Sequence, residues 1–203
     1  MYVIALTGGI GAGKTTAAEV FRARGAVVLS LDDIAKRHLA PGMPVHDQIV
    51  AEFGAGVLED GGTIDRRKLA ATVFSSPERA RRLNAIVHPA ILREVGPGLR
   101  DMGLLLNPPR VVVLDVPLLV EAPVFGELAE RVLAISAPEN LRIGRAVEAG
   151  MDEADVRARI RCQATDAQRE EMADEVIRNE GSLTEFQEAL ERYWDEVIAD
   201  APQ

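Results

Sequence analysis

The chain has 203 residues, and its 47% hydrophobic and 27% charged residues are typical of a soluble globular protein of one domain. Its 32 Asp and Glu outnumber 23 Lys and Arg, and the net charge of −9 argues against a general nucleic-acid binder or a protein that binds anionic membranes. The single cysteine excludes an intrachain disulfide, and with no signal peptide or membrane-length apolar run expected, the sequence predicts a cytoplasmic protein.

The first element is a short apolar strand over 2–6, followed by a glycine-rich turn and a helix over 15–24. The turn, residues 8–16, fills the phosphate-loop pattern Gly-x4-Gly-Lys-Ser/Thr at Gly8, Gly13, Lys14 and Thr15. Glycines let backbone N–H groups approach phosphate oxygens, Lys14 can reach the β- and γ-phosphates, and the Thr15 hydroxyl can bind Mg²⁺. A glycine-rich turn that binds nothing is the alternative, but the flanking strand and helix favour a nucleoside triphosphate site.

A second buried strand is predicted over 26–31, and it ends in Asp32 and Asp33 before a short helix. Ligands of open α/β sheets bind at the carboxyl edge of the strands, where a carboxylate could accept a hydroxyl proton as ATP loses its γ-phosphoryl group. Asp is also a favoured N-cap, and Asp33 is the better candidate for that role. From position alone, both interpretations of Asp32 stay open.

Four helical patterns fill the interval between the second and third strands, at residues 44–53, 65–74, 77–86 and 89–105. We expect this interval, residues 40–107, to form a helical lobe inserted into a single domain that spans 1–203. Its proposed role is to bind the substrate.

Two groups in this lobe have both a functional and a structural interpretation. Arg66, Arg67 and Lys68 could bind a second anionic ligand, or they could form a solvated helix face. His88 could act on the substrate, but the sequence His88-Pro89 also fits a helix start with Pro in its first position.

The third strand is predicted over 110–116. Asp115 follows four apolar residues in this strand, as in the acidic element of nucleotide hydrolases and kinases that holds Mg²⁺, often through water. Val116, rather than Glu, comes next, and the guanine-recognition signatures are missing, so motor ATPases and GTPases are disfavoured. The loop 117–121 follows at the ligand edge of the sheet.

A fourth strand is predicted over 131–136, followed by helices over 138–150 and from 152 to about 165. Arginines are frequent in this segment, and on a closing flap they could stabilise the charge of a transferring phosphoryl group. Pairing with acidic residues on the helix surface is the alternative for several of them. We expect a lid over about 138–170, in which one or two arginines contact the phosphates. The candidates are Arg142, Arg145, Arg157, Arg159, Arg161 and Arg169.

A fifth strand over 174–177 and an amphipathic helix over 183–198 complete the pattern, with Tyr193 and Trp194 expected to pack in the core. The predicted fold is α/β: a three-layer P-loop NTPase fold with a five-stranded parallel sheet, a helical substrate lobe and a lid.

Nearly the whole chain resembles the dephospho-coenzyme A kinase family, in the segments LTGGIGAGKTT, DDIAKRHLAPGMP, DGGTIDRRKLAATVF, LNAIVHPAI, DVPLLVE, RIRCQAT and ADEVIRNEG. The phosphate loop alone would indicate only a superfamily, but the HP, PLLVE and PG-containing segments in this order are more specific. The resemblance implies ATP-dependent phosphorylation of the ribose 3′-hydroxyl of dephospho-CoA. The products are CoA and ADP, and the reaction is the last step of coenzyme A synthesis.

The resemblance also implies roles for individual residues. The residues expected to bind ATP are Gly8, Gly9, Gly11, Ala12, Gly13, Lys14, Thr15, Thr16, Asn179 and Gly181. Catalysis is expected of Asp32 as the base, with Lys14, Arg142 and Arg145. Candidate substrate-binding residues are Asp32, Arg66, His88, Pro117, Leu118 and Glu121. Thr15 is the expected Mg²⁺ ligand, with Asp115 acting through water.

Two departures from the family pattern leave some roles open. Ser30 replaces the first carboxylate of an Asp-x-Asp pair, and Gly144 and Glu148 stand where Arg is usual. The first departure should be tolerated because the retained Asp32 matches the base. The second leaves open which arginine reaches the phosphates.

Two other functions stay in view: a kinase of another small hydroxyl compound, and an ATP-binding regulatory module without transfer. The expected partners are ATP, Mg²⁺ and dephospho-CoA, with no nucleic acid or membrane. A monomer is plausible, although the sequence does not determine the oligomeric state.

Overall fold

The computed structural model describes residues 1–201, and of Ile198 only the backbone. The chain forms two compact units. The first contains residues 1–30 and the chain from Gly98 onward, and the second contains residues 31–97. Each is described by itself.

The first unit is built on a sheet of five parallel strands, in the spatial order β2-β3-β1-β4-β5. Their bounds are β1 Tyr2–Gly8, β2 Val27–Ser30, β3 Val111–Asp115, β4 Arg131–Ser136 and β5 Glu175–Arg178. The predicted five-stranded parallel sheet is confirmed. Strands β1, β3 and β4 are almost wholly buried because helices cover both faces, which explains their continuous apolar sequences.

The register of the strands places the chemistry-bearing residues at one edge. Leu6 lies opposite Asp115, Asp115 lies opposite Ser30, and Gly8 lies opposite Ile135. All strands run in the same direction, so their carboxyl ends share this edge. The phosphate loop leaves the sheet there, as sheet geometry requires of a ligand site in such folds.

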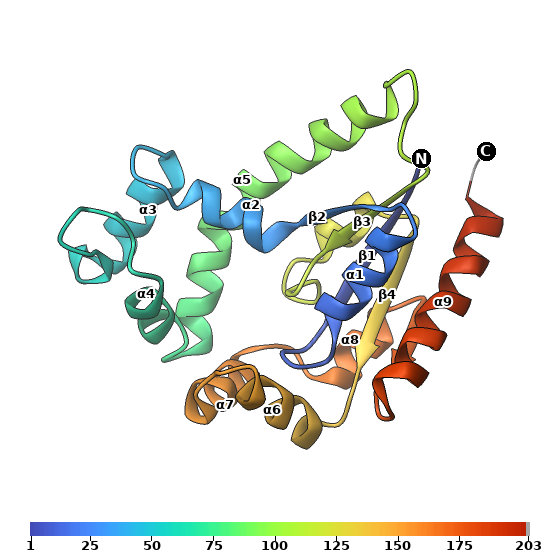
Figure 1. Cartoon of the computed structure of the whole chain (residues 1–203). Helices are drawn as coiled ribbons and strands as arrows, with labels where there is room; N and C mark the ends of the chain where they lie inside the picture. The colour runs from blue at the N-terminus through green and yellow to red at the C-terminus, as the bar shows by residue number, and fades with distance from the viewer. Residues whose placement is uncertain (202–203) are drawn as a thin grey trace. The chain divides into compact units, whose positions relative to one another are not determined.

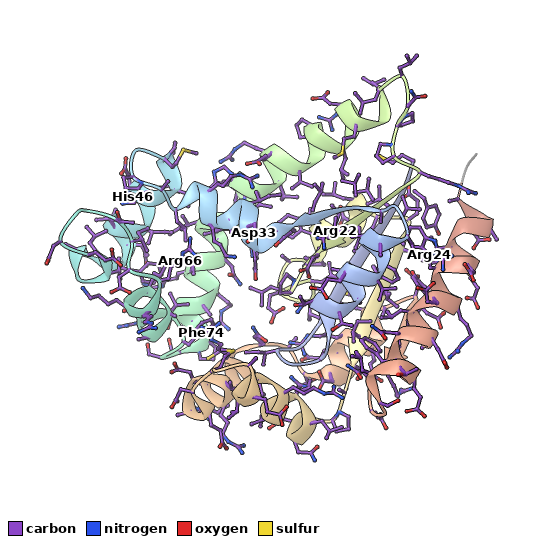
Figure 2. All side chains as sticks on the ribbon, in the orientation of Figure 1. Arg22, Arg24, Asp33, His46, Arg66 and Phe74 are labelled. Carbon is purple, nitrogen blue, oxygen red and sulfur yellow. The ribbon has the colours of Figure 1, made fainter. Side chains whose placement is uncertain are left out.

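Helices α1 (Lys14–Ala23) and α9 (Leu183–Asp200) lie side by side on one face of the sheet (Figure 1). Their shared core contains Phe21, whose ring stacks on Trp194 at 5.8 Å between centroids and also contacts Tyr193. The expectation that both C-terminal aromatics pack in the core is confirmed. Arg24 at the end of α1 pairs with Glu191 and Asp195 of α9 (Figure 2).

Four further elements belong to the first unit: η2 Pro123–Leu128, α6 Glu139–Glu148, α7 Glu153–Cys162 and α8 Asp166–Met172. Here the sequence prediction was partly wrong, because the second lid helix ends at Cys162 and α8 was not predicted as a separate helix. The local cause is a capping box, in which the Thr165 side chain accepts from Gln168 N while the Gln168 side chain accepts from Thr165 N. It starts a new helix directly after the position, about Thr165, where the second lid helix had been predicted to end.

The second unit contains α2 Leu31–His38, α3 Pro44–Phe53, η1 Ala55–Val57, α4 Arg66–Val73 and most of α5 Pro77–Gly103. Helices α3 and α4 match their predicted bounds to within one residue. Helix α2 begins before the aspartates, so Asp32 and Asp33 lie in its first turn and the predicted N-cap role of Asp33 is wrong.

The predicted helix start at His88-Pro89 is also wrong, because α5 continues without a break through Pro89 and Pro97. Proline removes one helical hydrogen bond and normally ends or kinks a helix. Both prolines are exposed, so water can satisfy the released carbonyls, while a buried stripe holds the helix in place. That stripe consists of Val87, Ala90, Ile91, Val95 and Leu99. The burial of this stripe therefore outweighs the free-energy cost of the hydrogen bonds lost at the two prolines.

None of the helices within residues 1–201 combines the length and hydrophobicity that crossing a membrane would need.

Candidate active site

The phosphate loop has the backbone shape that its glycines predict. Gly11 and Gly13 have φ values of 73° and 112°, in the left-handed region where only glycine is free of strain. A Cβ atom on Gly13 would lie 2.5 Å from Asn179 Nδ2, and one on Gly9 would lie 2.5 Å from Arg142 Nη1. Gly11 is also crowded, because its Cβ would overlap the Arg142 carbonyl oxygen. Gly11 and Gly13 are thus required both by backbone conformation and by close neighbours.

Asn179, directly after β5, joins the loop to α6. Its amide donates to the Ala12 carbonyl at 2.9 Å. Arg145 donates to the Asn179 carbonyl at 3.0 Å and to its Oδ1 at 3.3 Å. Asn179 is only 7% exposed, so it acts as a fixed bridge between the phosphate loop and Arg145.

A cavity of about 580 Å³ opens beside this bridge. The phosphate loop forms one wall with residues 9–11 and 13–16, and a second wall is mostly apolar. The second wall contains Ala146, Ala149, Met151, Leu183 and Phe186. The volume lies within the range of small-molecule sites, and the combination of polar loop and apolar wall suits the phosphates and base of a nucleotide. Lys14, Thr15, Arg145, Asn179 and Gly181 all line it, so the structure brings most of the predicted nucleotide residues together. Gly8 and Ala12 do not line it.

Arg142 lies against the phosphate loop and is 3% exposed. Its Nε donates to the Ala137 carbonyl at 3.1 Å, Nη1 donates to the Ile10 carbonyl at 3.3 Å, and Nη2 pairs with Asp166 at 2.7 Å. In this structure the predicted lid arginine is therefore held by the protein itself. Its role in transfer stays a prediction.

Arg169, also 3% exposed, belongs to the arginine-rich segment but was not singled out as a phosphate ligand from the sequence. It pairs with the other oxygen of Asp166 at 3.1 Å. Burial lowers the pKa of Arg169, and the nearby carboxylates of Asp166 and Glu121 partly offset this effect. The spacing Asp166-x-x-Arg169, which places both side chains on one face of a helix turn, is a sequence signal that could have singled it out.

Four predicted site residues lie at the carboxyl end of β3 or in the loop that follows it. Asp115 ends β3, and the loop with Pro117 and Leu118 follows it, both half-buried. Glu121 accepts a hydrogen bond from Ala164 N at 2.7 Å, which ties this loop to the segment before α8. Substrate contact by these residues is untested.

Among residues 1–201, no three His, Cys, Asp or Glu side chains gather as a metal cage. The Thr15 hydroxyl and the Asp115 carboxylate are oxygen donors of the kind that Mg²⁺ takes when substrate phosphates supply the rest of its ligands. The donor set fits that mode of binding.

Asp32, Arg66 and His88 lie on three different helices of the second unit. Asp32 is in the first turn of α2, and Arg66 is exposed as the first residue of α4 (Figure 2). His88 is half-buried in α5, and burial lowers its pKa, which favours the neutral imidazole. Their roles toward the substrate stay predictions.

The chain is similar to known proteins along nearly its whole length. A family model described as dephospho-CoA kinase matches residues 2–185. A dephospho-CoA kinase from Frankia casuarinae is 39% identical over 199 residues, which cover 98% of this chain and 85% of that protein.

Two solved structures share the fold. The protein TT1252 from Thermus thermophilus is 35% identical and superposes with a TM-score of 0.74 over 96% of this chain and 97% of its own. A dephospho-CoA kinase from Campylobacter jejuni, at 23% identity, has a TM-score of 0.69 over 98% of each chain, which supports the fold alone.

Proposed function

This chain belongs to the dephospho-CoA kinase family, and from that premise we propose that it phosphorylates the ribose 3′-hydroxyl of dephospho-CoA with ATP. The products are CoA and ADP, in the last step of coenzyme A synthesis. The structural observation that carries the proposal is the cavity bordered by the phosphate loop, in which most of the predicted nucleotide residues converge.

The triphosphate lies along residues 8–16 in this proposal. Backbone N–H groups of the loop and the N-terminus of α1 bind the phosphate oxygens, and Lys14 neutralises the β- and γ-phosphates. The adenine occupies the apolar wall near Met151 and Phe186, next to Asn179 and Gly181. Such a site orients the donor before any chemistry, and orientation accounts for much of the rate in phosphoryl transfer.

Arg145 and Arg142 supply positive charge as the γ-phosphoryl group moves. Arg145 lines the cavity and is braced by Asn179, so its guanidinium is already oriented. Mg²⁺, held by Thr15 and through water by Asp115, would neutralise charge on the phosphates.

The acceptor hydroxyl is activated by Asp32, which lies two residues after the last residue of β2. As the hydroxyl oxygen attacks the γ-phosphorus, its proton moves to the Asp32 carboxylate and the bond from phosphorus to the β–γ bridging oxygen breaks. The lobe over 40–107, with Arg66 and His88, and the loop residues Pro117, Leu118 and Glu121 bind dephospho-CoA. We place the enzyme in the cytoplasm.

The test is direct: incubate the protein with ATP, Mg²⁺ and dephospho-CoA, and measure CoA and ADP by mass spectrometry. We expect equal amounts of both products. The control is Lys14→Ala, which should lose at least about 100-fold in rate if the activity comes from this site. Phosphorylation of a different alcohol but not of dephospho-CoA would favour another acceptor. ATP binding with no transfer to any acceptor would favour a regulatory module.

A further inference from the structure

Three charged side chains form a cluster behind the phosphate loop: Arg142, Asp166 and Arg169. The carboxylate of Asp166 pairs with both arginines, through Oδ2 to Arg142 Nη2 at 2.7 Å and through Oδ1 to Arg169 Nη1 at 3.1 Å. The arginine side chains are 4% and 3% exposed, and that of Asp166 is 27% exposed. A single carboxylate therefore orients two buried guanidinium groups.

Both guanidinium groups lie against the loop itself. A Cβ atom on Gly9 would lie 2.5 Å from Arg142 Nη1 and 3.4 Å from Arg169 Nη1. Arg142 also donates to the Ile10 carbonyl at 3.3 Å. The positions of these two cations and the path of the loop are thus coupled by contact.

One buried donor of this cluster is not satisfied by the protein within the described residues. Arg142 and Arg169 are balanced by two carboxylates, because Glu121 as well as Asp166 favours the charged form of Arg169, while like-charge repulsion from Arg142 opposes it. Within residues 1–201, the buried Nε of Arg169 has no hydrogen-bond partner. A buried donor without a partner is costly, and an acceptor oxygen of an anion bound next to it would offset that cost.

On the basis of the function proposed above, we propose that Asp166 is a positioning residue for ATP, which acts by holding Arg142 and Arg169 against the phosphate loop. Asp166 is itself fixed as the first residue of α8, directly after Thr165, whose capping box with Gln168 starts the helix. The carboxylate touches no reacting atom in this account. Its effect reaches the phosphates through the arginines and through the loop at Gly9 and Ile10.

The test replaces Asp166 with Asn, which keeps the side-chain size and removes the charge. We expect kcat/KM for ATP to fall roughly 10- to 100-fold, since small misplacements of charged groups at a reacting centre have effects of this size. KM for dephospho-CoA should stay unchanged. The matched control is Glu171→Gln on the exposed side of the same helix, which should behave like the wild type. An Asp166→Asn enzyme with wild-type kinetics would overturn the proposal.

Binding measurements separate positioning from a merely structural role. By calorimetry, Asp166→Asn should weaken ATP but leave adenosine, which has no phosphates, bound as before. A structural defect in the pocket would weaken both ligands equally and would overturn the proposal. Should Asp166→Asn fail to fold, Asp166→Glu keeps the charge and displaces it by one methylene. It should again weaken ATP alone, and unchanged ATP binding would count against the proposal.

A double-mutant cycle with Arg142→Met tests whether Asp166 acts through that arginine. We expect Asp166→Asn to cost less than about 3-fold in kcat/KM in the Arg142→Met background, because the group that it positions is already missing. An equal loss of kcat/KM from Asp166→Asn in the wild type and in Arg142→Met would contradict the proposal that Asp166 acts through Arg142. Since ATP binding needs no acceptor, these results are distinct from a failure of the wild type to convert dephospho-CoA, which would affect only the proposed function.

Discussion

Asn179 is the residue on which the nucleotide side of the site is assembled. Its amide can donate and its carbonyl can accept, and the structure uses both, toward Ala12 and from Arg145. No other side-chain type of this size offers both functions in one plane. The orientation of the phosphate loop and that of Arg145 are therefore set by a single buried group.

Replacing Asn179 should damage ATP binding in a way that depends on the chemistry of the substitute. Asn179→Ala leaves the Ala12 carbonyl without its partner, and at roughly 1–3 kcal/mol for such a loss we expect KM for ATP to rise about 10-fold. Asn179→Asp should be no better, because a carboxylate repels the Ala12 carbonyl. Asn140→Ala on the exposed surface of α6 is the control. Initial rates at varied ATP give the comparison, and an unchanged KM in Asn179→Asp would refute the donor role.

Asp32 has a different kind of role in the proposal, because it acts on the acceptor. Asp32→Asn should bind ATP almost normally and lose at least about 100-fold in kcat, the usual contribution of a general base. Asp33→Asn provides a close control, since it removes the neighbouring carboxylate and an exposed pair with Lys36, which is worth little. Steady-state kinetics and ATP calorimetry on both variants decide the matter. Near-normal turnover in Asp32→Asn would remove Asp32 from the mechanism.

At the scale of elements, the loop between β1 and α1 depends on glycine for two separable reasons. Gly13 needs a positive φ of 112°, and it also needs the space that Asn179 occupies. Gly25, at the end of α1, has a similar φ of 98° but nothing within 4 Å of its would-be Cβ. A comparison of substitutions at Gly13 and Gly25 therefore separates the effect of backbone strain from the effect of contact with Asn179.

We expect Gly25→Ala and Gly13→Ala each to lose about 1–2 kcal/mol of unfolding free energy from left-handed strain. Only Gly13→Ala should also displace Asn179 and raise KM for ATP. Urea denaturation measures the first effect, and kinetics at varied ATP measure the second. If Gly13→Ala had the same KM for ATP as Gly25→Ala, the close contact between Gly13 and Asn179 would not matter for ATP binding.

Elements whose signals are local could be predicted from the sequence. The strands that contain Ile4 and Val113 are continuous apolar runs. The phosphate loop is recognised by its glycines, lysine and threonine at fixed spacing, because phosphate binding requires those residue types. The continuity of helix α5 through Pro89 could not be predicted from the sequence, because the buried stripe that stabilises the helix there depends on tertiary packing. The proposed positioning role of Asp166 could not be predicted either, because it depends on a salt bridge with Arg142, 24 residues away in sequence.

At the scale of the whole molecule, the chain divides into a unit that contains the nucleotide cavity and a unit, residues 31–97, that contains Asp32, Arg66 and His88. The proposed function assigns ATP to the first unit and assigns most of the dephospho-CoA contacts to the second. A ligand that binds only the native state stabilises it by about 2.7 kcal/mol at 100 times its Kd. Amides that exchange through opening of the occupied site should then exchange roughly 100-fold more slowly.

Hydrogen exchange followed by mass spectrometry should therefore map the two ligands to different segments. A non-hydrolysable ATP analogue should protect residues 8–16, 142–151 and 179–186, which line or brace the cavity. Dephospho-CoA alone should protect peptides within 31–97 and the loop 117–121. Lys14→Ala should abolish the first pattern and keep the second, which shows that the variant is still folded. Dephospho-CoA protection confined to the nucleotide unit would contradict the assignment of the helical lobe to the acceptor, while leaving the phosphate-loop site as it stands.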